Sequence, residues 1–358
     1  MNRIGVLGGS FDPIHIGHLI LAENACVQAG LSRVLFMPVH IQPFKQSVHV
    51  SPDDERLQML RFAIMDNPRF GVTTVELDRG GVSYTIDSLR VVRDNAACDR
   101  IAFILGTDMF LMIEKWYKAD ELLREFDLVV GVRPGYRHDE AQALAQKLRE
   151  AHGARIAFIG NPPVDLSSTQ IRERIAAGES IRYLAPENVR RYLLVQAQED
   201  GERFAHTKRV IELAAQMARR FGSESDVLRA MLAALLHDLR KDASGGADNN
   251  IRHGALAAEA AQKDFGVTDP DVLNAIRYHT TGRGGMSLLE KVIFLADTVE
   301  PGRAYDGIER LRTLCLEDLD RGAYTVLTEL REYLRQKGYT VTKDTEEAIM
   351  DLEERIGQ

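Results

Sequence analysis

Two histidines follow a pair of glycines near the start of the chain, where residues 8–18 read GGSFDPIHIGH. Glycine lets backbone approach a ligand closely, and the helix expected over about 17–29 begins with N–H groups that can hold an anion. His15 and His18 are three residues apart and can lie on the same side of this turn. A glycine pair alone is usually only a turn, but the whole string predicts a site where amides and imidazoles hold phosphate oxygens.

Four histidines and two aspartates recur in the second half of the chain, on segments of helical periodicity. They are His206, His237, Asp238, His253, His279 and Asp297. A carboxylate on an apolar helix face is costly, and a metal ion offsets that cost. Imidazoles and carboxylates together suit Fe²⁺, Mn²⁺, Co²⁺ or Zn²⁺, which lower the pKa of a bound water. Each residue alone is more simply a core histidine or a helix cap, but six on converging apolar faces predict a metal centre.

A second anion-binding segment is LSSTQIR at 166–172. Ser167 or Ser168 can act as the N-cap of a helix, and the helix start together with Arg172 would hold another phosphate group. Between the two phosphate segments, aromatic faces at Trp116 and Tyr117 can stack on a planar ring. The pairing of 166–172 with the glycine–histidine segment, in this order, favours a shared nucleotide site over a simple cap.

The elements that would position the first group alternate in type. Strand-like runs occur at 3–7, 33–37, 71–77, 101–105, 127–132 and 155–159. Each is followed by a helical pattern, which indicates βαβ units and a doubly wound, mostly parallel sheet. Ligands of such sheets bind beyond the carboxyl ends of the strands, where the glycine–histidine segment falls.

From about residue 203 the pattern changes to helix after helix. His206, Val210, Leu213 and Met217 share one face, as expected for an amphipathic helix. The polar segment 196–202 is interpreted as a linker and 241–250 as a surface loop. The expected organisation is therefore an α/β domain over 1–198, an all-α domain over 203–340 and a C-terminal helical extension over 341–358.

Composition limits the number of domains, the partners and the compartment that can be expected. The chain has 358 residues, more than one core usually holds, and a formal net charge of −8, which argues against non-specific binding of nucleic acid. Its three cysteines lack C-x-x-C spacing, which favours a reducing compartment. Neither a signal-peptide layout nor a membrane-length apolar run is present. We expect a cytoplasmic protein with no nucleic-acid and no membrane partner, and its association into a homo-oligomer stays open.

The first domain resembles a known enzyme family. Residues 8–18 are similar to the H-x-G-H signature of the nucleotidylyltransferase superfamily, and matches across 1–195 resemble the nicotinate-mononucleotide adenylyltransferases. Segment 167–172 looks like the S-S-T-x-I-R motif of that family, and 106–108 looks like its G-x-D. The resemblance implies a Rossmann-like fold. It also implies transfer of the adenylyl group of ATP to nicotinate mononucleotide, with Mg²⁺, giving nicotinate adenine dinucleotide and pyrophosphate without a protein nucleophile.

The same resemblance implies roles for individual residues. ATP contacts are implied for Gly8, Gly9, Ser10, Phe11, Gly106, Asp108, Ser167, Ser168 and Thr169. Catalytic neutralisation of phosphate charge is implied for His15, His18, Lys45 and Arg172. Contacts to nicotinate mononucleotide are implied for Thr85, Trp116, Tyr117 and Arg133. Around Lys45 the chain departs from the usual family pattern, since Phe44 and residues 40–42 differ in type and spacing.

The second domain resembles the HD superfamily, and the likeness covers about 203–340. Segments 278–283, 286–291 and 296–301 are similar to a subgroup that hydrolyses diadenosine tetraphosphate to two ADP and is associated with iron. The resemblance implies that His206, His237, Asp238 and Asp297 hold a first metal, with Asp238 also catalytic. His253 and His279 would complete a second metal or bind phosphate. Polyphosphate contacts are implied for Lys241, Thr280, Arg283 and Arg303, and the implied cofactor is Fe²⁺/Fe³⁺ or another divalent transition metal.

Alternatives stay open for both domains. The first could transfer a nucleotidyl group to another phosphate acceptor, because the phosphate motifs are shared across the superfamily. The second could be another nucleotidase, or a non-catalytic HD module that binds nucleotide and regulates its neighbour. A complete set of metal ligands disfavours the last interpretation, since a binding module needs no activated water.

Overall fold

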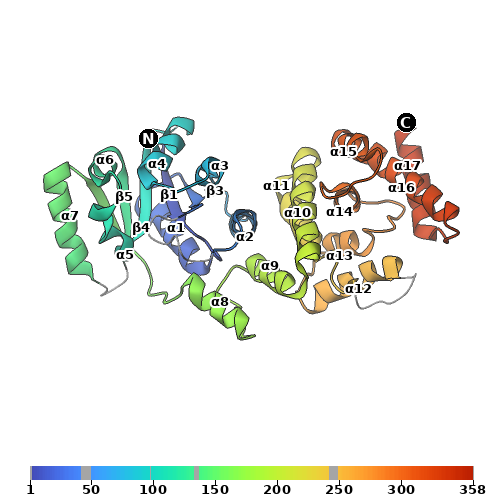
Figure 1. Ribbon diagram of the computed structural model, residues 1–358, viewed down its shortest axis with the longest axis horizontal. Coiled ribbons are helices and arrows are strands. Elements are labelled where there is room, and N and C mark those ends of the chain that lie inside the picture. The colour runs from blue at the N-terminus through green and yellow to red at the C-terminus, as the bar shows by residue number, and fades with distance from the viewer. Residues whose placement is uncertain (1, 42–49, 97, 133–136, 242–248, 358) are drawn as a thin grey trace. The chain divides into compact units, whose positions relative to one another are not determined.

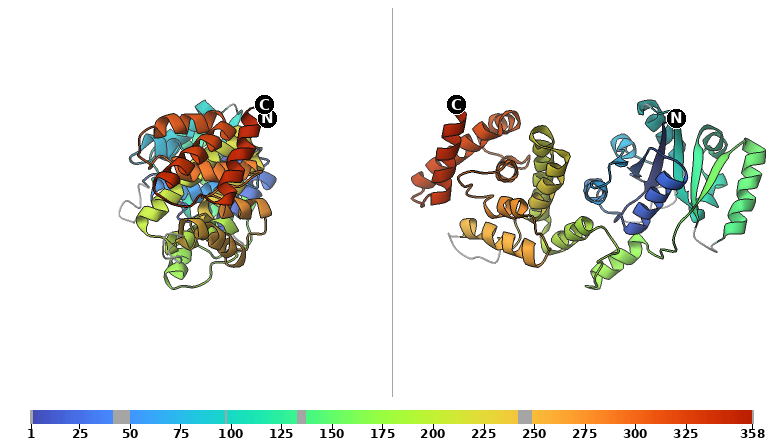
Figure 2. Two further views of the ribbon diagram at one scale, coloured as in Figure 1. Left: turned by 90° about the vertical axis from the view of Figure 1, so that its right-hand side faces the viewer. Right: turned by 180° about the vertical axis from the view of Figure 1, so that it is seen from behind.

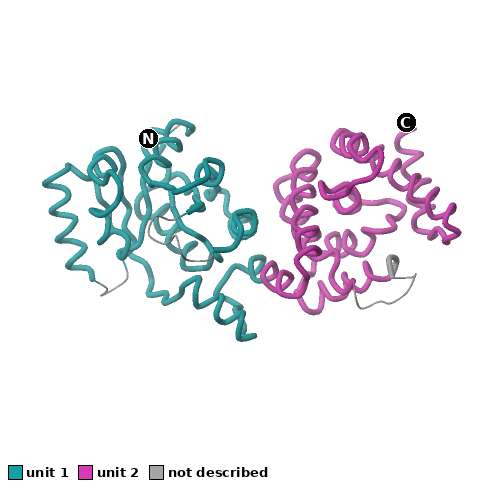
Figure 3. The backbone as a smooth tube through the Cα atoms, in the orientation of Figure 1, with its two compact units in different colours: residues 1–190 teal, residues 191–358 magenta. Residues whose placement is uncertain are grey.

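The computed structural model describes residues 2–41, 50–96, 98–132, 137–241 and 249–357 (Figure 1). The chain divides into two compact units, Met1–Arg190 and Arg191–Gln358 (Figure 3). Within the described ranges, no helix is both long and apolar enough to cross a membrane. Cys26, Cys98 and Cys315 are free thiols.

A six-stranded parallel sheet forms the centre of the first unit. Its strands are β1 (Arg3–Gly9), β2 (Arg33–Pro38), β3 (Phe70–Val72), β4 (Arg100–Gly106), β5 (Asp127–Val132) and β6 (Arg155–Gly160), in the order β3-β2-β1-β4-β5-β6. This is the doubly wound order expected from the alternating pattern, and its direction of winding reverses between β1 and β4. Leu7 pairs with Phe36 on one side and Ile104 on the other, so residues 8–9 end at that reversal point.

Helices connect the strands of the first unit, and two further helices follow the last strand (Figure 2). They are α1 (Ile16–Gln28), α2 (Asp53–Ile64), α3 (Val75–Arg79), α4 (Thr85–Asn95), α5 (Thr107–Phe110), η1 (Ile113–Lys115), α6 (Ala119–Glu125), α7 (His138–His152), α8 (Ser168–Ala176) and α9 (Glu187–Gln198), the last crossing the unit boundary. Apolar residues of β1, β4 and β5 pack against those of α4 and α6 in one core, as Val6, Phe103, Val130, Leu89 and Leu122 show. That core holds the strand ends at which the site forms.

One strand expectation was too long. The run 71–77 was expected to be a single strand, but β3 ends at Val72 and Val75–Arg79 is helical. Glu76 and Asp78 lie in the first turn of α3, where acidic residues favour the helix dipole, and this local preference outweighs the β-branched pattern.

The second unit is helical throughout the residues described. Its helices are α10 (Gly201–Phe221), α11 (Glu224–Leu236), α12 (Asn249–Lys263), α13 (Pro270–Arg277), α14 (Leu288–Val299), α15 (Ile308–Glu317), α16 (Leu319–Gln336) and α17 (Lys343–Ile356). Helix α10 packs on α11 and α14, α13 packs on α11, α12 and α14, and α17 packs on α16. The expected α/β-then-all-α class is therefore confirmed.

The segment expected to be a linker is largely helical. Helix α9 continues to Gln198 and α10 begins at Gly201, where the Asp200 carboxylate accepts a hydrogen bond from the Arg203 N–H at 2.9 Å. Glutamine and glutamate are good helix formers, so polarity alone did not indicate a loop. Most of the surface loop expected at 241–250 lies outside the described residues.

We expect Gly254→Ala to destabilise the second unit by about 1–3 kcal/mol, because added volume in a packed interface forces backbone shifts. A Cβ at Gly254 in α12 would lie 2.5 Å from the Arg277 carbonyl oxygen at the end of α13. Gly201→Ala is the matched control, since a Cβ there meets no described atom within 4 Å. Urea denaturation measures both, and equal stability of the two variants would contradict the close contact.

Candidate functional sites

The turn after β1 places two imidazoles side by side. His15 is the N-cap of α1, and the rings of His15 and His18 lie 3.8 Å apart. The backbone N–H of His15 donates to Nδ1 of His18 at 3.2 Å, so the proton of a neutral His18 ring is at Nε2. Burial, together with repulsion from His15, lowers the pKa of His18 well below its ordinary value. His18 is therefore a neutral hydrogen-bond donor at pH 7.

Phe11 packs against the ring of His18. Its side chain is buried, and its ring contacts the edge of His18 at 5.1 Å and Phe36 at 5.7 Å. Its φ of 49° lies in the left-handed region, which is uncommon for a bulky residue. Because the side chain is buried, the ATP contact predicted for Phe11 is expected to come from its backbone.

The start of α8 meets the same loop, although about 155 residues separate them in sequence. Ser167 is the N-cap, because its hydroxyl accepts from the Gln170 N–H at 3.2 Å. The hydroxyl of Ser168 donates instead to the Pro13 carbonyl at 2.8 Å, and Arg172 donates to the Asp12 carbonyl. The two phosphate motifs predicted from sequence therefore lie together.

A cavity of about 750 Å³ opens between these motifs. Its lining includes nine residues of the predicted site, namely Ser10, His15, His18, Gly106, Asp108, Ser167, Ser168, Thr169 and Arg172. The helices α1 and α8 both begin at this cavity, and their N–H groups and dipoles favour a negatively charged ligand. The arrangement can bind a polyphosphate.

A second, more apolar cavity of about 620 Å³ adjoins the first. Gly8, Gly9, Thr85, Trp116 and Tyr117 of the predicted site line it. His18, Leu21, Val39 and Gly106 line both cavities. His18 therefore stands where a ligand in one cavity would meet a ligand in the other.

The second cavity is suited to a planar ring with a polar substituent. The rings of Tyr84 and Tyr117 lie 4.4 Å apart at its wall, and the ring of Trp116 contacts Phe103 at 5.8 Å. The indole Nε1 of Trp116 is buried and has no hydrogen-bond partner among the described residues. Glu76 also lines this cavity and was not predicted from sequence; burial raises the pKa of its carboxyl group.

Two predicted residues, Lys45 and Arg133, lie outside the described residues. Their roles stay predictions.

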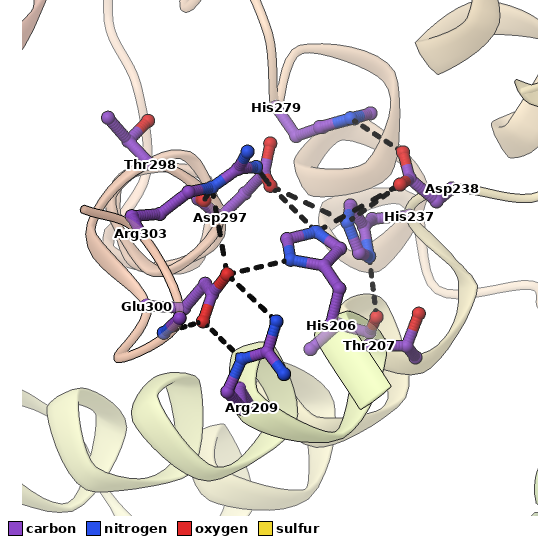
Figure 4. A network of polar contacts seen from close by, with 12 residues as sticks. His206, Thr207, Arg209, His237, Asp238, His279, Asp297, Thr298, Glu300 and Arg303 are labelled. Carbon is purple, nitrogen blue, oxygen red and sulfur yellow. Dashed lines mark hydrogen bonds and ion pairs between the residues drawn. The ribbon is translucent and has the colours of Figure 1, made fainter. Parts of the chain in front are cut away.

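The six predicted metal ligands of the second unit converge on one centre. Figure 4 shows five of them, His206, His237, Asp238, His279 and Asp297. His206 Nε2 lies 3.0 Å from Asp297 Oδ1, and His237 Nε2 lies 3.9 Å from the same oxygen. Asp238 is 3.6 Å from His237, 3.4 Å from His253 and 3.7 Å from His279. Residues from α10, α12 and α14 and from the turns after α11 and α13 are thus brought together.

Hydrogen bonds on the outer side of each ring fix which nitrogen faces the centre. His237 Nδ1–H donates to the Ala234 carbonyl and His279 Nδ1–H donates to the Ile276 carbonyl, both at 2.7 Å. His206 Nδ1 lies 3.1 Å from the carboxylate of Glu300. In each case Nε2 is the nitrogen that faces the interior, which is how metal-ligating histidines are usually oriented.

The buried polar atoms of this centre fit a metal ion. Among the described residues, Nε2 of His237 and Oδ1 of Asp238 are buried without a hydrogen-bond partner. Burial lowers the pKa of His237 to about 4, so its ring is neutral and able to ligate at pH 7. Burial would raise the pKa of Asp297, but nearby His206 and His237 hold it well below its usual range.

Two overlapping triads satisfy the spacing of a metal site. They are His206, His237, Asp297 and His237, Asp238, His279, with ligand atoms within 4.8 Å of one another in each. His253 Nε2 lies 2.9 Å from His279 Nε2, next to the second triad. The donor set of imidazoles and carboxylates suits a divalent transition metal.

The four candidate polyphosphate-binding residues around this centre differ in the partners that they have in the structure. Lys241 Nζ lies 2.5 Å from Asp238, and Arg303 lies 2.9 Å from Asp297. Thr280 Oγ1 is buried with no partner in the described parts of the chain. Arg283, in contrast, makes two hydrogen bonds to the buried carboxylate of Glu290, at 2.6 and 2.7 Å. A polyphosphate role for Arg283 would need that pair to open.

Sequence reasoning missed Glu300, which orients His206. Its side chain is 2% exposed, and it also pairs with Arg209 at 2.5 Å. The signal available in the sequence was its spacing of three residues from Asp297, which places the two carboxylates on neighbouring positions of a helix end.

Comparison with known proteins agrees with this division. The cytidylyltransferase-like family model matches residues 6–174, and the HD domain model matches residues 203–302. A probable nicotinate-nucleotide adenylyltransferase of Herpetosiphon aurantiacus is 41% identical over 196 residues, which are 55% of this chain and 98% of that protein. The nicotinate-nucleotide adenylyltransferase of Bacillus subtilis is 37% identical over 193 residues, 54% of this chain and 96% of that protein.

A solved structure is similar to part of the chain. It is a predicted HD superfamily hydrolase involved in NAD metabolism from Clostridium acetobutylicum, with 30% identity and a TM-score of 0.42, covering 46% of this chain and 96% of that one. The family follows from the sequence relatives and the family models, which cover the two adjoining cavities of the first unit and the histidine–aspartate centre of the second. The chain belongs to the nicotinate-nucleotide adenylyltransferase family, and it carries an HD domain after the adenylyltransferase portion.

Proposed function

We propose that the first unit transfers the adenylyl group of ATP to nicotinate mononucleotide, releasing pyrophosphate and forming nicotinate adenine dinucleotide. The observation that carries this proposal is the position of His18 at the junction of a phosphate-binding cavity and an aromatic one. An oxygen of the acceptor 5′-phosphate forms a bond to the α-phosphorus of ATP while the bond to the β-phosphate oxygen breaks. No protein nucleophile takes part, so catalysis rests on positioning and charge neutralisation.

Each part of the larger cavity has a task in this reaction. His18 donates from Nε2 to an oxygen of the reacting α-phosphate, and His15 stands beside it. The start of α8 and Arg172 hold the β- and γ-phosphates that leave, and Asp108 contacts the adenosine ribose. Mg²⁺, when bound, neutralises charge on the leaving pyrophosphate. Lys45 is proposed to contribute a further positive charge.

The smaller cavity is proposed to hold the nicotinate group. The rings of Trp116 and Tyr117 give a planar ring a stacking surface, and the hydroxyl of Thr85 can donate to its carboxylate. Arg133 is proposed as a further contact. The matched relatives are named for this acceptor, which supports it over other phosphate acceptors.

For the second unit we propose hydrolysis of diadenosine tetraphosphate, in which water adds across the central P–O–P bond to give two ADP. His206, His237, Asp238 and Asp297 would hold a first metal ion, with His253 and His279 at a second position. When bound, the metal supplies the Lewis acidity that activates water at neutral pH. Lys241, Thr280, Arg283 and Arg303 are proposed to receive the polyphosphate, and Asp238 is proposed to orient the attacking water. The HD domain is taken as 203–340, after an adenylyltransferase domain of 1–198 and before an extension of 341–358.

A product assay on the intact chain tests both activities. ATP plus nicotinate mononucleotide is expected to yield nicotinate adenine dinucleotide and pyrophosphate, and diadenosine tetraphosphate alone is expected to yield ADP only. Replacing nicotinate mononucleotide with other phosphate acceptors checks the smaller cavity, and ATP plus AMP as products would reveal asymmetric cleavage. A purified metal-bound chain that hydrolyses no dinucleoside polyphosphate would contradict the second activity and favour a regulatory HD module.

A further inference from the structure

A fully buried guanidinium lies behind the phosphate-binding loop. Arg56 of α2 has 0% exposure, which is rare for arginine. Its Nη1 donates to the Ser10 carbonyl at 2.7 Å, its Nε donates to the Ser51 carbonyl at 3.1 Å, and its Nη2 binds Oδ1 of Asp53. A buried charge with this many partners fixes the backbone it touches, and here that backbone includes a residue of the cavity wall.

The second oxygen of Asp53 holds a histidine that neither phosphate motif contains. Oδ2 of Asp53 accepts from Nδ1 of His40, and His40 lines the larger cavity. Because the carboxylate accepts the hydrogen bond from Nδ1–H, the other ring nitrogen, Nε2, is the one left for a ligand. Arg56, Asp53 and His40 therefore form a chain of contacts that runs from the core to the cavity.

We propose that His40 is a third imidazole of the nucleotide site, which donates from Nε2 to the triphosphate, and that Asp53 and Arg56 are its positioning residues. The proposal rests on the proposed adenylyl transfer. The imidazole of His40 stands between the Asp53 carboxylate and the larger cavity, so its Nε2 is the atom that would meet a bound triphosphate. The same guanidinium binds the Ser10 carbonyl, so Arg56 fixes the position of His40 relative to the glycine-rich turn.

Neighbouring contacts connect this chain to the second phosphate motif. The Ser51 N–H donates to Oδ2 of Asp12 at 3.3 Å, and Arg172 Nη1 lies 3.5 Å from the same oxygen. Ser51 thus binds Arg56 through its carbonyl and Asp12 through its amide. The starts of α2 and α8 are in this way coupled through two side chains at the edge of the cavity.

The test is a double-mutant cycle on the full chain with ATP and nicotinate mononucleotide. His40→Ala is expected to lower kcat/KM for ATP on the order of tenfold to a hundredfold, the range of one charge-assisted hydrogen bond, with KM for nicotinate mononucleotide unchanged. Asp53→Asn is expected to lower it by about threefold to tenfold in the wild type and to have a clearly smaller effect in the His40→Ala background, where only its contact with Arg56 is left to lose. Asp54→Asn is the control, because it removes a carboxylate from the same first turn of α2.

The outcomes separate the inference from the function on which it rests. If the wild type makes nicotinate adenine dinucleotide and His40→Ala stays within twofold of it, the inference is wrong. An equal loss from Asp53→Asn with and without His40 would make Asp53 a structural residue only. If the wild type forms no product, adenylyl transfer fails; calorimetric binding of ATP to wild type and His40→Ala then still measures whether His40 holds the triphosphate.

Discussion

His237→Ala is expected to abolish metal binding at the candidate centre of the second unit and to lower the proposed hydrolysis of diadenosine tetraphosphate at least a thousandfold, on the order expected when activated water is lost. His237 is the residue common to both candidate metal triads, and its side chain is fully buried. Removing it withdraws a neutral ligand from the site of two carboxylates, Asp238 and Asp297, whose mutual repulsion opposes keeping both charged when no metal is held. Metal content of the purified chain and release of ADP measure the two effects.

Adenylyl transfer by the same preparation serves as an internal reference, and it is expected to be unchanged because the first unit has its own cavities. Thr345→Val is the matched control for a buried polar change in the second unit. Its hydroxyl donates to the Thr281 carbonyl at 2.9 Å and does not belong to either metal triad. A His237→Ala protein that retains both its metal and its hydrolysis would contradict the assignment of this centre.

Substitution of Glu300, a residue that the sequence did not indicate, is expected to have a weaker effect than substitution of His237. Glu300 touches His206 and no candidate metal position, and residues that orient a ligand in this way usually change metal affinity tenfold to a hundredfold. The sequence indicated the ligands because imidazoles on apolar helix faces are unusual. Glu300 carries no such mark, since an acidic residue at a helix end is ordinary, and only the folded chain places it against His206.

The fold was predictable where one periodicity dominated. Strands such as Asp127–Val132 are buried throughout and read as continuous apolar runs, as strands covered on both faces do. Prediction failed where local preferences competed: the β-branched run beginning at residue 71 turns into helix at Val75, and the polar stretch after residue 196 is mostly helical. In both places glutamate stabilises a helix start or interior, which a reading of polarity alone does not detect.

The candidate nucleotide site was predictable as a set of motifs but not as a set of contacts. Ser167 and Ser168 were equivalent in sequence, and the structure separates them, since one caps α8 and the other binds the Pro13 carbonyl. Arg56 shows the opposite difficulty. In a helix rich in charged residues it reads as a solvated side chain, yet it is fully buried because three acceptors from two other segments and its own helix converge on it. Such convergence depends on tertiary structure alone.

His18→Ala is expected to lower kcat of adenylyl transfer on the order of a hundredfold to a thousandfold, the usual effect of removing one donor to a developing phosphate charge. KM for either substrate should change little, because the hydrogen bond from His18 to the α-phosphate strengthens mainly as charge develops in the transition state. The fold should persist, since the ring supports α1 chiefly through one hydrogen bond from the His15 amide. Steady-state kinetics with both substrates measures the separation of kcat from KM.

His152→Ala provides the comparison for a histidine of the same unit. His152 is the last residue of α7, and its Nε2 lies 3.7 Å from Oδ1 of Asp120. It lines neither cavity, so turnover should match the wild type. His18→Asn sharpens the test, because an amide group can donate one hydrogen bond from a similar position and should recover part of the lost rate. Near-wild-type turnover of His18→Ala would mean that the imidazole is only a structural member of the turn. A loss confined to KM would instead place His18 in ground-state binding and leave stabilisation of the transition state to the helix starts and Arg172.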